Sequence, residues 1–90
     1  MVTAFICKGN NQAVDIFFDN ENILVRFFKT RLSLQKVEDE ESLVHYRNCN
    51  QIDVPDAFYE QVVEMFNTQE NLSRSMDRFR NVYSGVIADL

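Results

Sequence analysis

Two hydrophobic runs separated by a short polar segment dominate the first third of the chain. Residues 13–18 and 23–28 are rich in β-branched and aromatic side chains, and the polar residues 19–22 lie between them. Asn and Asp tolerate turn conformations, so this pattern predicts an antiparallel β-hairpin. Side chains alternate between the two faces of a strand. The residues predicted on the core face are Val14, Ile16, Phe18, Ile23, Val25 and Phe27.

Shorter apolar runs on both sides of the hairpin predict further strands. Residues 2–7 form one run, which ends at a turn-forming segment containing Gly9. Apolar and polar side chains alternate from residue 32 to Val37, as in a fourth strand. The segment 32–47 allows two interpretations: a second hairpin whose return strand is residues 43–47, or a helix over residues 33–46. We favour the hairpin, because the apolar stripe of such a helix is poor and is interrupted by Glu41.

Two helices are predicted in the C-terminal half. Asp53 can accept hydrogen bonds from the first free helical amides, and Pro55 suits a first helical turn. The helix that follows, over about residues 54–67, carries an apolar stripe made by Phe58, Tyr59, Val62, Val63, Met65 and Phe66. A second helix is expected over about residues 69–89. A short connection between them predicts an antiparallel pair.

Strands followed by helices predict an α+β fold. We expect an antiparallel sheet of three to five strands, with the C-terminal antiparallel pair of helices packed on one face. The chain of 90 residues contains only two Gly and one Pro, which leaves no segment with the composition of a flexible linker. Residues 1–90 are therefore expected to form a single domain.

The sequence offers little of the chemistry that enzymes use. His45 is the only histidine, and neither Ser42 nor Cys49 has the glycine-flanked setting of a catalytic nucleophile. His45 and Cys49 have the spacing of two metal ligands on a helix, but no second pair completes a tetrahedral site. We predict no metal, no cofactor and no catalytic activity. We also expect Cys7 and Cys49 to be small buried side chains rather than a disulfide, as is usual in a reducing cytoplasm.

The hydrophobicity pattern and the overall charge argue against two kinds of partner, membranes and nucleic acids. No apolar run approaches the roughly 18 residues of a membrane span, and the first residues lack the basic segment of a secretory signal. We therefore expect a cytoplasmic protein without membrane contact. The net charge of −5 argues against binding to nucleic acid, which requires a positive surface.

Carboxylates are concentrated in the middle of the chain. Eight of them lie between positions 38 and 64, where Arg47 is the only Lys or Arg. Such a surface can imitate a track of phosphates and occupy the DNA-binding groove of a partner. In size and charge the chain resembles the small acidic inhibitors made by phages and mobile elements. The alternative is a solvated acidic segment followed by a helix whose dipole favours acids in its first turn.

The chain also has more large apolar side chains than one core face can accommodate, because helices packed on one side leave the other side of the sheet open. An open aromatic face indicates an interface, and a homodimer is the simplest case. We expect a small regulatory or inhibitory protein that acts by protein–protein contact, with two alternatives: a DNA mimic, and a weak nucleic-acid binder that uses the last helix. The predicted partner-binding residues are Phe17, Phe28, Glu38, Asp39, Glu40, Glu41, Arg74 and Arg78.

Overall fold

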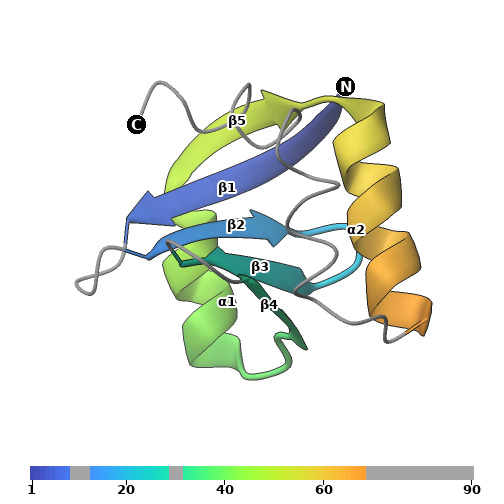
Figure 1. Ribbon diagram of the computed structural model, residues 1–90. Helices are drawn as coiled ribbons and strands as arrows, with labels where there is room; N and C mark the ends of the chain where they lie inside the picture. Colours follow the sequence, from blue (N-terminus) through green and yellow to red (C-terminus); the bar gives the residue numbers. More distant parts are fainter. Residues whose placement is uncertain (9–12, 29–31, 69–90) are drawn as a thin grey trace.

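The computed structural model describes residues 1–8, 13–28 and 32–68, which form one antiparallel sheet and two helices (Figure 1). The strands are β1 (Val2–Lys8), β2 (Val14–Phe18), β3 (Ile23–Phe27), β4 (Leu32–Lys36) and β5 (Asn50–Val54). The helices are α1 (Glu40–Arg47) and α2 (Asp56–Thr68). The α+β class predicted from the sequence is confirmed for these residues. In this part of the chain, no helix has both the length and the apolar character needed to cross a membrane.

The strand order explains the position of α1. The sheet runs β4-β3-β2-β1-β5, so the first four strands form a meander and β5 joins the opposite edge, beside β1. After β4 the chain must therefore cross the whole sheet before it can add β5. Helix α1 makes this crossing over one face of the sheet (Figure 1).

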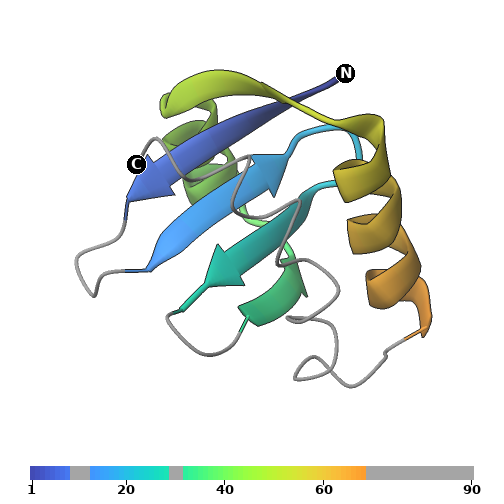
Figure 2. The same ribbon diagram turned by 45° about the horizontal axis from the view of Figure 1, so that its top comes forward.

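Among the described residues, one helix packs on each face of the sheet (Figure 2). Helix α2 packs Phe58, Val62 and Met65 against one face. The strand residues on this face include all six that the alternation predicts: Val14, Ile16, Phe18, Ile23, Val25 and Phe27. Val14 is partly buried and the other five are buried. Helix α1 packs Leu43 and Tyr46 against the other face, over Phe17 and Leu24. The described part of the chain therefore has two hydrophobic cores, one on each side of the sheet.

The β2–β3 hairpin is confirmed. Phe18 pairs with Ile23, and the polar residues between them make the turn. Asn22 has a positive φ of 54°, a conformation that Asn adopts at lower cost than most residues. Its carbonyl accepts a hydrogen bond from the amide of Val37 at 2.8 Å, which ties the turn to the end of β4.

Residues 43–47 are helical, so the predicted second hairpin is wrong. The Asp39 carboxylate accepts a hydrogen bond from the amide of Ser42 at 2.9 Å and caps the helix. The acidic residues after it lie in the first turn, where the helix dipole favours negative charge. Because α1 has only eight residues, Leu43 and Tyr46 are enough to hold it on the sheet. A longer apolar stripe was not required.

The fifth strand and the helix arrangement also differ from the prediction. Asp53 lies in β5 and does not cap α2, which begins at Asp56 with amides donating to the Pro55 carbonyl. Helix α1 precedes β5, so the helices do not simply follow the strands, and α1 and α2 lie on opposite faces of the sheet. The helix predicted over residues 69–89 lies outside the described residues.

Candidate functional site

Antiparallel pairing brings a row of polar and sulfur-containing side chains together beneath α1. Cys7 of β1 lies opposite Asp15 of β2, and Asp15 lies opposite Arg26 of β3. The β1–β5 register, extended by one residue beyond Ile6 and Asn50, places Cys49 opposite Cys7. We call Cys49, Cys7, Asp15 and Arg26 the cross-strand row.

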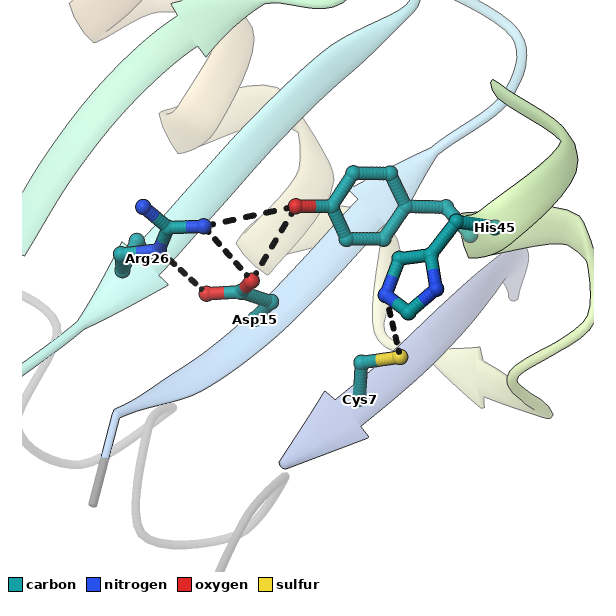
Figure 3. Close-up of polar contacts among 5 residues, drawn as sticks. Cys7, Asp15, Arg26 and His45 are labelled. Carbon is teal, nitrogen blue, oxygen red and sulfur yellow. Dashed lines mark hydrogen bonds and ion pairs between the residues drawn. The ribbon is translucent and has the colours of Figure 1, made fainter. Parts of the chain in front are cut away.

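One half of the cross-strand row is an ion pair. The Arg26 guanidinium donates from Nε to Asp15 Oδ1 at 2.8 Å and from Nη2 to Oδ2 at 3.0 Å (Figure 3). Tyr46 of α1 donates its hydroxyl to Asp15 Oδ2 at 3.2 Å. Asp15 is only 6% exposed, so its charge has lost most of its contact with water. The bidentate guanidinium and the phenol replace that hydration.

The two partners of Asp15 have shifted acidities. The hydrogen bond with Asp15 raises the pKa of Arg26, so this guanidinium stays charged at any accessible pH. Burial, followed by the negative charge of Asp15, raises the pKa of Tyr46. Tyr46 therefore remains a neutral hydrogen-bond donor. The three groups form a structural network with no free base or nucleophile.

The other half of the row contains sulfur. Cys7 and Cys49 form a disulfide, with α-carbons 5.6 Å apart, so the expectation of two separate thiols is wrong. That expectation rested on compartment alone, whereas the fold places the two residues opposite each other. His45, on the last turn of α1, points its ring toward Cys7, with 3.6 Å between Nε2 and Sγ (Figure 3). All three donor atoms lie within 4.8 Å of one another.

The predicted aromatic contacts do not lie on an open face. Phe17 is completely buried and stacks on Tyr46, with ring centroids 5.2 Å apart. Phe28, directly after β3, is half-buried. The sequence argument assumed that helices cover one face only, and α1 covers the second.

The predicted acidic contacts are all exposed, at the start of α1. These residues are Glu38, Asp39, Glu40 and Glu41. The remaining acids of the central stretch lie elsewhere: Asp53 on edge strand β5, and Asp56, Glu60 and Glu64 on α2. The eight carboxylates are thus divided between the two faces and one edge of the sheet. Arg74 and Arg78 lie outside the described residues.

The sequence contained part of the signal for this site. Asp15 and Arg26 are the single charges on the second faces of the two hairpin strands, and the hairpin register pairs them. The position of Cys49 depended on β5, which was placed incorrectly. No protein-family model matches the chain, and comparisons with curated proteins and with solved structures give no significant match.

Proposed function

We propose that this protein is a small non-enzymatic regulator that acts by binding a basic surface of another protein. The contact surface is the start and the outward side of α1. We define this acidic face as Glu38, Glu40, Glu41 and Val44, all of them exposed. The acidic face takes the place of Phe17, which was predicted as a contact residue and is buried in the structure.

The observation that carries the proposal is the combination of unpaired charge with an exposed apolar side chain. Within residues 1–8, 13–28 and 32–68, no basic group forms an ion pair with Glu38, Glu40 or Glu41. Arg47, the nearest base in sequence, pairs instead with Asp19 at 2.9 Å. Val44 is 54% exposed on the same helix. An apolar residue bordered by carboxylates suits a partner that presents an apolar contact surrounded by Lys or Arg.

The DNA-mimic alternative requires carboxylates that follow one continuous surface. The acids lie on three different elements, the start of α1, β5 and α2, so a continuous track has less support than the sequence pattern alone suggested. A protein partner needs only the local group on α1. The alternative remains useful as a distinct outcome of the same experiment.

The test begins with affinity capture of the partner from the native cell, followed by measurement of the dissociation constant. The first variant combines Glu38→Gln, Glu40→Gln and Glu41→Gln, and the second is Val44→Ser. We expect both to weaken binding, and only the first to reduce its salt dependence, because charge neutralisation removes a screened attraction. The control combines Asp56→Asn, Glu60→Gln and Glu64→Gln on α2, with the same number of charges removed. This control should leave the affinity unchanged.

Three results would contradict the proposal. Equal loss of affinity in the α1 and α2 variants would indicate a general charge effect. Unchanged affinity in the α1 variants would exclude the acidic face as the contact. Competition between DNA and the protein for the captured partner would favour the DNA mimic.

A further inference from the structure

We propose that, when the Cys7–Cys49 disulfide is reduced, Cys7, Cys49 and His45 bind a zinc ion. The three side chains come from β1, from the turn after α1 and from the last turn of α1. Their donor atoms lie within 4.8 Å of one another. This site is independent of the acidic face.

The donor set matches the preference of zinc. Two thiolates and one imidazole are ligands that Zn²⁺ takes in proteins, and three protein ligands leave a fourth position for water or another ligand. The close Cys7–His45 approach is visible in Figure 3. His45 is exposed and the two sulfurs are half-buried, so a metal ion can reach the site from solvent.

One distance already fits a metal centre. With Zn–S near 2.3 Å and Zn–N near 2.05 Å, tetrahedral geometry places a sulfur and a nitrogen ligand about 3.6 Å apart. The distance between Cys7 Sγ and His45 Nε2 is 3.6 Å. The two sulfurs must separate to roughly 3.8 Å on the same geometry, which requires the disulfide to be broken.

The metal and the disulfide exclude each other. An added phosphine reduces the disulfide by transferring two electrons to the sulfur pair. One water molecule supplies the two protons of the resulting thiols. The oxygen of that water is bound by phosphorus, which becomes a phosphine oxide. Binding of Zn²⁺ by two thiolates then releases those two protons. In the disulfide form, Cys49 Sγ lies 3.4 Å from the His45 carbonyl, a distance at which the thiol produced by reduction can donate a weak hydrogen bond.

Fixed contacts hold His45 near the cysteines. Its ring lies edge-on to Tyr46, with centroids 5.0 Å apart, and Tyr46 is held by Asp15. At the same helix end, Arg47 is paired with Asp19. These contacts fix the last turn of α1 over the sheet. A preorganised histidine lowers the entropy cost of metal binding.

The test uses the full chain, reduced with a phosphine under anaerobic conditions and titrated with Co²⁺ and then Zn²⁺. We expect one Co²⁺ per chain, with the visible absorption of a tetrahedral thiolate site, and displacement of Co²⁺ by Zn²⁺. The oxidised protein should not bind. Loss of a supporting contact alone costs metal sites about 10-fold to 100-fold in affinity, so His45→Gln and Cys49→Ser should each cost at least that much. Asp53→Asn, which removes an exposed carboxylate on β5, is the control and should bind as the parent chain does.

Circular dichroism, recorded on the same samples, covers the case in which reduction unfolds the chain. Zinc should then restore the helix and strand signal, because binding and folding are coupled. The proposal is overturned if the reduced chain binds Co²⁺ no more tightly than the Cys7→Ser/Cys49→Ser double variant. It is equally overturned if His45→Gln has no effect on the affinity or on the absorption spectrum.

Discussion

Asp15 and Arg26 lie opposite each other on β2 and β3 and form a two-point ion pair, at 2.8 and 3.0 Å, on a face of the sheet that α1 covers. Arg47 and Asp19 form a second pair of nearly the same length, 2.9 Å, between α1 and the β2–β3 turn. The two pairs differ in burial. In the first pair the Asp15 side chain is 8% exposed and that of Arg26 is 37% exposed. In the second pair the side chains of Arg47 and Asp19 are 46% and 40% exposed.

This difference gives the first prediction. Arg26→Gln removes the ion-pair partner of the buried Asp15 carboxylate, which keeps the hydrogen bond from Tyr46. It should lower the free energy of unfolding by about 2 kcal/mol, less than for a fully buried pair, because Arg26 is partly exposed. Arg47→Gln should cost at most about 1 kcal/mol, because its pair is exposed. The double variant Asp15→Asn/Arg26→Gln should recover much of the loss, because no charge remains buried. Urea unfolding measures all three. Equal effects of Arg26→Gln and Arg47→Gln would show that burial does not matter here.

Tyr46 gives a prediction about alkaline pH. Burial raises its pKa above the ordinary value, so the folded protein holds the phenolic proton more tightly than the unfolded chain does. The resulting stability is complete below a pH of about 10 and is lost as the pH rises through the folded pKa. Tyr46→Phe removes this contribution and keeps the stacking on Phe17. The difference in unfolding free energy between parent and variant should therefore shrink as the pH rises above about 10. Tyr59, whose pKa is raised chiefly by burial, is present in both proteins and cancels from the comparison.

Phe17 separates a core position from an interface position. The sequence analysis placed Phe17 among the partner-binding residues, on an aromatic face that a homodimer would cover. The structure buries Phe17 completely between the sheet and Tyr46, so Phe17→Ala should lower the free energy of unfolding by about 3 to 5 kcal/mol. Phe17→Asp should prevent folding. A folded Phe17→Asp monomer, shown by circular dichroism and light scattering, would restore the interface hypothesis.

What the sequence could predict depended on how local the signal was. Val14, Ile16 and Phe18 were placed on the correct face, because alternation within one strand determines the face. A helix over residues 33–46 was the alternative that we did not favour. Only two buried residues, Leu43 and Tyr46, hold α1 on the sheet, and they are too short a pattern to distinguish a helix from a strand. The main local signal of α1 was the Asp39 cap.

The Cys7–Cys49 contact was missed for a non-local reason. It depends on which strand pairs with β1, and the partner strand comes after a crossover of the whole sheet. By contrast, Asp15 and Arg26 belong to one short hairpin, which the sequence predicted, although the register that pairs them comes from the structure. Their contact with Tyr46 was not predicted, because it requires α1 to lie on that face.

The disulfide gives a prediction about stability. Cys7 and Cys49 are 42 residues apart, and the chain-entropy relation for a loop of this length gives a stabilisation of about 4 kcal/mol. The Cys7→Ala/Cys49→Ala variant, studied without added metal, should be less stable by up to about this amount. Reduction of the parent chain in the presence of a chelator should have a similar effect. Unfolding curves identical to those of the oxidised protein would show that the bridge does not constrain the unfolded chain.

The last prediction concerns the cap of α1, and it has an acidic-pH signature. Hydrogen bonding with Ser42 lowers the pKa of Asp39 below its ordinary value, so the folded state favours the ionised carboxylate. This contribution is present above the ordinary pKa of an aspartate, about 3.9, and is lost as the pH falls through the lower folded value.

Asp39→Ala should destabilise α1 at neutral pH, whereas Asp39→Asn keeps an acceptor for the Ser42 amide and should be milder. On acidification, the protection of the α1 amides in the parent chain should fall to that in Asp39→Asn. The control Glu38→Gln, one residue outside the cap, should show the same loss of protection as the parent chain. Hydrogen exchange of the α1 amides at neutral and acidic pH measures the effect. Equal protection of α1 in the parent and in Asp39→Ala would mean that packing of Leu43 and Tyr46 on the sheet, without the cap, determines the stability of this helix.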